Sequence, residues 1–284
     1  MNAPEIICHL ASDGYPMAVR VWKPLDALGR VIVVHGIVSH GGWYLRSCRF
    51  LADHKLEVHA LDRRGSGLNF RQRGDVANVS RWLEDVEEYI NTLSPRLPTV
   101  LLGISWGGKL AALLSTRDKT SLAGIGLICP GIFAHQQANF MQQILLRVAG
   151  SSGLANRLVR IPLRAPELFT DHPIYKAYIR DDPFTLRQIT IRFANADLQL
   201  NKLARASAKL IRLPIFLMLA GREKIVNNDR TLQFWEQVKS TQKNLIQYHA
   251  AAHTLEFEAD PSKYLTELYA QVLNILDGVN GEEF

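Results

Sequence analysis

Short apolar runs rich in β-branched residues alternate with segments of helical periodicity along most of the chain. This alternation is typical of a mostly parallel α/β sheet. The central runs are apolar throughout, as expected of strands covered on both faces. The expected strands are Met17–Trp22, Val31–Val34, Glu57–Leu61, Thr99–Leu102, Gly124–Ile128, Ile215–Leu219 and Asn244–Tyr248. The helices expected between and after them are Tyr44–His54, Val79–Thr92, Lys109–Thr116, Thr231–Lys239 and Pro261–Leu276.

The segment 131–213 interrupts this alternation. Its pattern is helical and is broken by four prolines, so we expect an insertion on the sheet and not a separate domain. We predict that residues 1–130 and 214–284 form one core and that 131–213 form a helical cap. The helices expected in the cap are Phe140–Val148, Thr185–Phe193 and Leu198–Leu210.

The composition is that of an ordinary globular protein. Of 284 residues, 47% are hydrophobic and 21% are charged, which excludes collagen, coiled coil and disorder. Neither a signal peptide nor a membrane span is expected. The three cysteines, at no metal-like spacing, are expected to be reduced thiols in a cytoplasmic protein, and no metal or other cofactor is expected. The net charge of +6 permits attraction to anionic lipid or nucleic acid but specifies neither, and we expect no nucleic-acid partner.

A Gly-x-Ser-x-Gly motif stands where a strand–turn–helix nucleophile is required. It runs from Gly103 to Gly107 with Ser105 at its centre, after the expected strand Thr99–Leu102 and before the helix from Lys109. In this setting the hydroxyl projects at the carboxyl edge of the sheet. The glycines are needed because a β-carbon in so tight a turn would collide with backbone. We predict a catalytic nucleophile at Ser105; the alternative is a structural serine that caps the helix.

A serine nucleophile needs a histidine base that is itself oriented by an acid. In this fold the acid and then the histidine follow the serine along the chain. His253 lies in the loop between the last expected strand and the last helix, whereas His249 stands at the strand end. We predict that His253 is the base and keep His249 as the alternative. His135 and His172 fall in the insertion, where surface or lining positions are expected.

The acid is expected in the loop after the strand Ile215–Leu219, where two carboxylates compete. Glu223 comes two residues after Gly221, and Asp229 lies six residues further on, at the start of a helix. A capping or first-turn role explains Asp229 equally well. We prefer Glu223, because its longer arm still reaches the imidazole if the loop is slightly retracted, and keep Asp229 as the alternative acid.

Two backbone amides must stabilise the oxyanion that forms on the attacked carbonyl. One comes from the residue after the nucleophile, Trp106. The other is expected from the loop after an early strand, here His35-Gly36-Ile37, in which glycine permits the turn and the Ile37 amide faces the serine. His35 has the residue type of a second base, but its place in the turn favours a structural hydrogen bond.

Several motifs, in order and spread over most of the chain, carry a resemblance to a known family: His35-Gly36 with Gly41-Gly42-Trp43-Tyr44, Leu61-Asp62-Arg63-Arg64-Gly65-Ser66-Gly67, Gly103-Ile104-Ser105-Trp106-Gly107-Gly108, Ala220-Gly221-Arg222-Glu223 and His253-Thr254-Leu255-Glu256. They resemble the α/β-hydrolase superfamily and, within it, the monoacylglycerol lipase or lysophospholipase-like group. The resemblance implies the α/β-hydrolase fold, with a mostly parallel central sheet, helices on both faces and a helical cap. It also implies Ser105 as nucleophile, His253 as base and Ile37 and Trp106 as oxyanion donors. The usual aspartate of the family falls at Glu223.

We therefore expect a serine hydrolase that cleaves a carboxylic ester through an acyl-enzyme. By resemblance, the substrate is a lipid-like monoester such as a monoacylglycerol or a lysophospholipid. The alternatives on the same triad are a thioesterase, an acyltransferase or a proline iminopeptidase-like aminopeptidase, which would use cap acids to hold the substrate amine. A non-catalytic ligand receptor on a hydrolase scaffold is the alternative from another class. The candidate amine-holding acids are Glu167, Asp171, Asp181, Asp182 and Asp197.

The insertion combines basic and apolar side chains, which suits peripheral contact with an anionic lipid surface. The competing interpretation is a cap whose apolar side packs on the sheet while its arginines face water. The residues concerned are Arg147, Arg157, Arg160 and Arg164 with Phe140, Ile144, Leu145 and Leu154.

Overall fold

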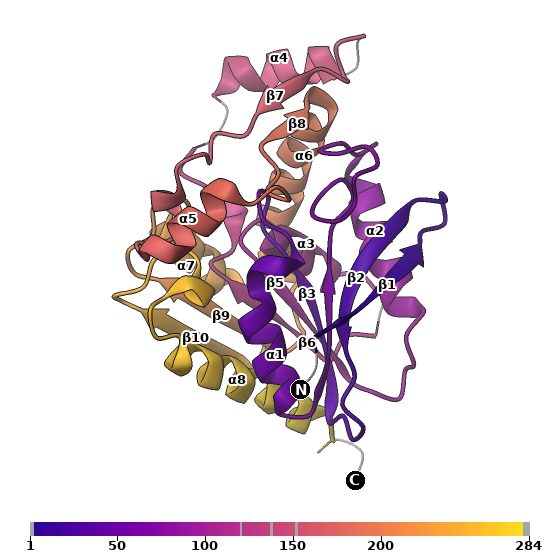
Figure 1. Ribbon diagram of the computed structural model, residues 1–284, viewed down its shortest axis with the longest axis vertical. Coiled ribbons are helices and arrows are strands. Elements are labelled where there is room, and N and C mark those ends of the chain that lie inside the picture. Colours follow the sequence, from indigo (N-terminus) through magenta and orange to yellow (C-terminus); the bar gives the residue numbers. More distant parts are fainter. Residues whose placement is uncertain (1–2, 120, 137–138, 151–152, 281–284) are drawn as a thin grey trace.

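A computed structural model describes residues 3–119, 121–136, 139–150 and 153–280. Eight strands form one sheet in the order β1-β2-β4-β3-β5-β6-β9-β10 (Figure 1). β1 and β2 pair antiparallel, β2 and β4 pair antiparallel, and all other neighbours are parallel. The strands are β1 (Glu5–Leu10), β2 (Pro16–Trp22), β3 (Gly29–Val34), β4 (Leu56–Leu61), β5 (Thr99–Ile104), β6 (Gly124–Ile128), β9 (Ile215–Ala220) and β10 (Lys243–Tyr248).

All seven expected strands are confirmed, with ends that shift by at most two residues. β3, β5, β6 and β9 are buried at every position, which explains why they consist of apolar residues and glycine except for Arg30 and Thr99 near their starts. The edge strand β1 was missed, because none of its residues is fully buried and its sequence mixes polar and apolar side chains without a clear alternation.

Helices cover both faces of the sheet. α1 (Leu45–Asp53) and α8 (Ser262–Asn280) pack together on one face, and α2 (Val79–Asn91) and α3 (Gly107–Leu114) pack together on the other (Figure 1). α7 (Asn228–Gln237) connects β9 to β10 and begins three residues before the predicted helix, because the Asn227 side chain accepts from the Arg230 amide and caps it. The expected α/β-hydrolase architecture is confirmed.

Between β6 and β9 the chain forms an irregular cap. It contains α4 (Phe140–Gly150), β7 (Leu158–Arg160), α5 (Pro173–Asp181), β8 (Gln188–Thr190) and α6 (Ile191–Ser207), with 3₁₀ turns at Gly131–Phe133, Pro166–Leu168 and Ala208–Leu210. In Figure 1, α4 and β7 lie at the far end of the cap from the central sheet.

The structure corrects the predicted helices of the cap in two places. The range Thr185–Phe193 is not one helix, because its residues 188–190 pair antiparallel with β7 and Thr190 then caps α6 by accepting from the Phe193 amide. α5 was not predicted, although it begins with Pro173 at its first position, where proline is tolerated.

Hydrogen bonds join the cap to the loops that follow β3 and β4. Asp182 accepts from His40 Nε2 and from Trp43 Nε1, each at 2.9 Å. The Leu186 amide donates to the Val38 carbonyl at 2.8 Å. These contacts fix one end of the cap beside the carboxyl edge of the sheet. Among the described residues, none of the helices has the length and apolar character needed to cross a membrane.

Candidate active site

Ser105 lies in a strained turn between β5 and α3. Its φ is +52°, a left-handed conformation that is uncommon outside glycine. A β-carbon at Gly103 would lie 2.7 Å from the Gly107 carbonyl oxygen, and one at Gly107 would collide with the Val34 carbonyl. The two glycines of the motif therefore allow the turn to fold closely against β3 and α3, which leaves the serine at the carboxyl edge of the sheet.

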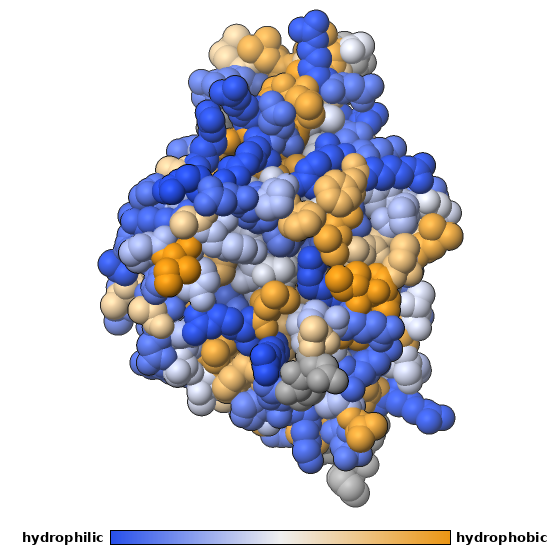
Figure 2. Space-filling model, in the orientation of Figure 1, coloured by the Kyte–Doolittle hydropathy of each residue, from blue (hydrophilic) through white to orange (hydrophobic). Residues whose placement is uncertain are grey.

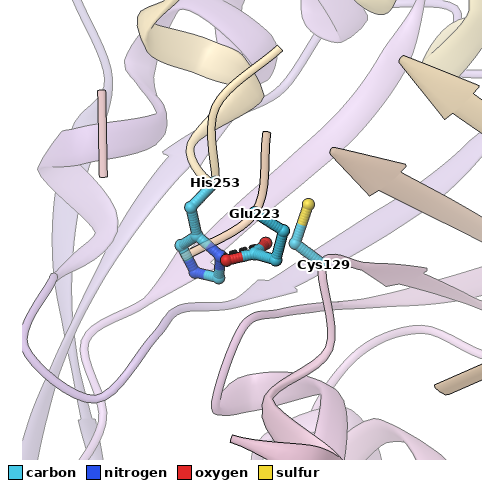
Figure 3. A group of neighbouring side chains, drawn as sticks. All are labelled: Cys129, Glu223 and His253. Atoms are coloured by element: carbon cyan, nitrogen blue, oxygen red, sulfur yellow. Dashed lines mark hydrogen bonds and ion pairs between the residues drawn. The ribbon is translucent and has the colours of Figure 1, made fainter. Parts of the chain in front are cut away.

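His253 joins Ser105 to Glu223 through two hydrogen bonds. Its Nε2 lies 2.9 Å from Ser105 Oγ, and its Nδ1 lies 2.7 Å from Glu223 Oε2. A carboxylate at Nδ1 favours the tautomer that carries the proton there, so Nε2 is left to accept from the serine hydroxyl. Figure 3 shows the His253 ring beside the carboxylate of Glu223. The three side chains come from the turn after β5, the loop after β9 and the loop after β10.

The loop after β9 holds Glu223 in its charged form. Burial alone would raise the pKa of this carboxyl, but His253 and the amides of Ile225 and Val226 outweigh burial and lower it. The two amides donate to Oε1 at 2.7 and 3.1 Å, so Oε2 is left for the imidazole. Asp229 lies in the first turn of α7 and is exposed; it makes no contact with His253.

The loop after β3 lies close to Ser105. A β-carbon at Gly36 would lie 3.3 Å from Ser105 Cβ, and Ile37 lines the same cavity as Ser105 and Trp106. The Ile37 amide donates no hydrogen bond to any of the described residues. His35 is fully buried, and burial is the largest factor that lowers its pKa well below the usual value. Its Nδ1 donates to the Gly36 carbonyl at 2.8 Å, so its role is to shape the turn.

Arg63 is hydrogen bonded to the same loop. Its Nη2 donates to the carbonyls of Gly36 at 2.8 Å and Ile37 at 3.0 Å, and its amide donates to His35 Nε2 at 3.0 Å. The guanidinium carbon lies 4.3 Å from the ring centre of Trp106. Burial lowers the pKa of Arg63 to about 9, so it remains charged at neutral pH. The motif contained Arg63, but the sequence carried no signal that predicted this role.

His249, His135 and His172 lie away from the Ser105 hydroxyl. His249 is exposed just beyond the end of β10. His135 is exposed at the wall of the cavity, and His172 is half-buried before α5. None of them lies within hydrogen-bond distance of Ser105 Oγ in the described part of the chain.

A cavity of about 1740 Å³ lies between the cap and the core and contains Ser105. Apolar side chains such as Ile37, Ile161 and Leu198 line part of it. Asp197 of α6 enters from the cap and accepts from Trp106 Nε1 at 2.6 Å and from Lys109 Nζ at 2.8 Å. Of the five acids considered as amine anchors, it is the one that lines this cavity. Its role in joining α6 to the nucleophile turn was not predicted.

Cys129 lies beside Glu223 and His253 (Figure 3). One ligand-type atom from each of Cys129, Glu223 and His253 lies within 4.8 Å of the others. However, the Glu223 carboxylate and the His253 ring are hydrogen bonded to each other, and burial raises the pKa of the thiol well above its usual value. A protonated thiol is a poor metal ligand, so we assign a packing role to Cys129.

Comparison with known proteins identifies the family. The family described as "Serine aminopeptidase, S33" matches residues 26–260. The chain belongs to this family. The human monoglyceride lipase is 28% identical over 260 residues, which cover 88% of this chain and 84% of that protein. The monoacylglycerol lipase of Mycolicibacterium smegmatis is 22% identical, with coverage of 93% and 95%.

Solved structures agree with the family assignment at the level of the fold. The crystal structure of the monoacylglycerol lipase from Paleococcus ferrophilus superposes with a TM-score of 0.83 at 19% identity, and covers 91% of this chain and 99% of that chain. As a member of the S33 family, the chain is a hydrolase of the lipase and esterase type. The resemblance to the monoacylglycerol lipase-like group is likewise confirmed.

Proposed function

We propose that this protein hydrolyses the carboxylic ester bond of lipid-like monoesters by means of a Ser105–His253–Glu223 triad. The observation that carries the proposal is the continuous chain of hydrogen bonds from Ser105 Oγ through both ring nitrogens of His253 to Glu223. In this geometry the imidazole is held in the tautomer that a general base requires. The names of the relatives, monoglyceride and monoacylglycerol lipases, support a lipid ester as substrate.

The reaction follows from these positions. Ser105 Oγ attacks the ester carbonyl carbon while His253 Nε2 takes the hydroxyl proton, and the amides of Ile37 and Trp106 stabilise the oxyanion. The imidazolium then gives its proton to the leaving alcohol oxygen, and the ester C–O bond breaks to form an acyl-enzyme. Water, deprotonated by the same imidazole, attacks the acyl carbon of this intermediate. The imidazolium then returns that proton to Ser105 Oγ as the bond between the acyl carbon and Oγ breaks, so the acid is released and the serine hydroxyl is restored. Glu223 stabilises the imidazolium in both halves.

The cavity gives no support to the aminopeptidase alternative. Such an enzyme would hold a substrate ammonium with a carboxylate in the cap. Asp197 lines the cavity, but Lys109 and Trp106 already donate to it. Asp182 accepts from His40 and Trp43, which ties the cap to the core. No feature of the described residues favours a thioester, an acyl acceptor other than water or a purely ligand-binding role.

Peripheral contact of the cap with anionic lipid belongs to the same proposal. Hydrophobic and hydrophilic residues lie side by side over the cap in Figure 2. Exposed apolar side chains on α4 and beyond it lie near arginines, a combination that suits an anionic lipid surface. Sedimentation with vesicles of anionic lipid, compared with neutral vesicles, tests this contact. The exposed apolar residues are Met141, Ile144, Leu145, Val148 and Leu154.

The catalytic proposal is tested by labelling with a fluorophosphonate probe and by ester turnover. Ser105→Ala should abolish labelling and lower kcat by several powers of ten, because only binding and the oxyanion hole remain. His253→Ala should lower kcat to a similar extent, because members of one catalytic unit are not additive. His249→Ala, the matched control, should change kcat by less than about tenfold. Undiminished turnover in Ser105→Ala would refute the proposal.

A further inference from the structure

Positive side chains dominate the charge of the cavity that holds Ser105. Among the residues that the structure describes, six Lys and Arg residues line it but only one carboxylate, that of Asp197. The whole chain carries 33 Lys and Arg against 27 Asp and Glu. The rest of the sequence therefore contains 27 Lys and Arg against 26 Asp and Glu, and almost all of the net charge of +6 belongs to residues that line the cavity. The six cations are Lys109, Arg147, Arg160, Lys202, Arg205 and Lys224.

The cations belong to separate elements that enclose the cavity. Lys109 comes from α3, Arg147 from α4 and Arg160 from β7. α6 contributes Lys202 and Arg205. Because four separate elements contribute, the positive charge surrounds the cavity instead of following one exposed helix face.

Lys109 and Lys224 each lie near a carboxylate. Lys109 forms a 2.8 Å ion pair with Asp197. Lys224 lies 3.5 Å from Asp171, but this carboxylate is also 2.9 Å from Arg222. In the described part of the chain, no carboxylate lies within 4.0 Å of Arg160 or Lys202. The positive potential of the cavity is therefore not cancelled by its own ion pairs.

One of the cations, Arg205, contacts the turn next to Ser105. Arg205 Nε donates to the Ile132 carbonyl at 3.1 Å. Ile132 follows Gly131, whose amide donates to the Ser105 carbonyl at 2.6 Å. Arg205 thus reaches the turn that supports the nucleophile, while Arg160 and Lys202 are exposed on the cap. The same cavity is also lined by apolar residues such as Ile161 and Leu198, which suit an acyl chain.

From this arrangement we infer that the ester taken by this cavity carries a negative charge, as a phosphate or a carboxylate. The inference rests on the proposed function, because it names the class of ester that Ser105 attacks. A cleft of one sign with low-dielectric walls focuses its field and raises the local concentration of substrates of opposite charge. A neutral glycerol ester has no net charge for the six cations to attract, and they repel a substrate ammonium. A lysophospholipid with an acidic phosphate headgroup fits this cavity, because its acyl chain can contact the apolar lining residues and its phosphate can contact the cations.

The test compares esters that are matched except for charge. A short-chain 1-acylglycerol is compared with the 1-acylglycerol 3-phosphate of the same acyl chain, and 4-nitrophenyl valerate with mono-4-nitrophenyl glutarate. We expect kcat/KM at low salt to be at least about tenfold higher for the anionic member. This advantage should shrink between about 20 and 200 mM salt, since charges in an open cleft are screened. If the anionic ester is preferred only in the acylglycerol pair, the cavity recognises a phosphate headgroup. If it is preferred in both pairs, the cavity recognises anionic groups in general.

Variants separate the cavity charge from the chemistry. Arg160→Gln and Lys202→Gln remove charges outside the proposed catalytic machinery, so kcat/KM for the neutral esters should stay unchanged. For the anionic esters each variant should lose about three- to tenfold, and the double variant more. Lys263→Gln, on the exposed surface of α8, makes the same charge change away from the cavity and should have no effect.

The outcomes distinguish the two proposals. Equal or faster hydrolysis of the neutral esters, with Ser105 labelled normally by a fluorophosphonate, would overturn the anionic substrate and leave the serine hydrolase standing. An anionic preference that the Arg160→Gln/Lys202→Gln double variant leaves undiminished would overturn recognition of the substrate charge by these two side chains. Absence of both labelling and turnover would overturn the proposed function itself.

Discussion

One peptide unit links Arg63 to the proposed oxyanion hole. The carbonyl of Gly36 and the amide of Ile37 belong to the same planar group, and in a trans peptide they point in opposite directions. Arg63 Nη2 and His35 Nδ1 both donate to that carbonyl at 2.8 Å. This fixes the direction of the Ile37 amide and polarises it, since hydrogen bonds along a chain strengthen one another. Arg63 also lies under the ring of Trp106, the residue that supplies the second amide.

We therefore expect Arg63→Met to lower kcat by about 10- to 100-fold with little change in KM. This is somewhat less than the loss of a donor that touches the oxyanion directly. Arg63→Lys keeps the charge and one donor and should recover part of kcat. Steady-state kinetics of both variants measures kcat and KM separately, and thermal unfolding shows whether the fold is intact. A folded Arg63→Met protein with raised KM and unchanged kcat would contradict the positioning role.

The acid of the proposed triad can be tested at single residues as well. Glu223→Gln keeps the shape but removes the charge that stabilises the imidazolium, so kcat should fall by roughly 10²–10⁴. Glu223→Asp should leave activity reduced but measurable, because the loop is adapted to the longer arm. Asp229→Asn is the matched control: it should cost less than about tenfold in kcat and at most about 1 kcal/mol in unfolding free energy. A larger kcat loss for Asp229→Asn than for Glu223→Gln would reverse the assignment.

At the scale of elements, what the sequence could predict depended on how local each signal was. The strands β3, β5, β6 and β9 were predictable because burial on both faces makes nearly all of their positions apolar. The nucleophile turn was predictable because its glycines are a steric necessity. The cap was only partly predictable. Its residues 188–190 form a strand because they pair with β7, about thirty residues earlier, and a helical pattern in one segment cannot reveal that partner.

The same limit applies to the candidate site. The spacing of Ser105, Glu223 and His253 along the strands was enough to predict a triad, because the carboxyl ends of parallel strands meet at one edge. The supporting residues had no such signal. Asp197 was one of five cap acids, and only the packing of α6 against α3 brings it to Lys109 and Trp106.

Glu256 shows how one element positions another. It lies in the turn Leu255–Phe257 just after His253, and its Oε1 accepts from the Arg46 and Ser47 amides at 2.7 and 3.1 Å. These amides belong to the first turn of α1, which has no capping side chain of its own. The loop that carries His253 is therefore anchored to a helix more than 200 residues earlier in the chain.

At the scale of the whole molecule, charge couples stability to pH through buried carboxylates. Glu57 lies between His59 and Arg30, and these partners, His59 first, lower its pKa to about 2. Burial opposes ionisation of Asp182, but hydrogen bonds from His40, Trp43 and Thr185 outweigh it and lower the pKa of Asp182 as well. Glu57 pairs within the sheet, and Asp182 ties the cap to the core.

A carboxyl whose pKa is lower in the folded state binds its proton more weakly there than in the unfolded chain. Its contribution to stability is therefore complete above the unfolded pKa and is lost as the pH falls toward the folded one. For Glu57 this window runs from about 4.5 down to about 2. We expect the free energy of unfolding to fall steadily below pH 4.5, with Asp182 adding to the loss below about pH 4.

Urea unfolding at a series of pH values from 7 to 2.5 measures this dependence. Glu57→Gln and Asp182→Asn should each be less stable than the parent at pH 7, because a charged hydrogen bond is lost. Each should also lose less stability on acidification, so that the curves of variant and parent converge at low pH. Glu236→Gln, at an exposed position of α7, serves as a control for the loss of a surface carboxylate. Curves for Glu57→Gln and the parent that stay parallel down to pH 2.5 would show that this carboxylate does not couple folding to protons.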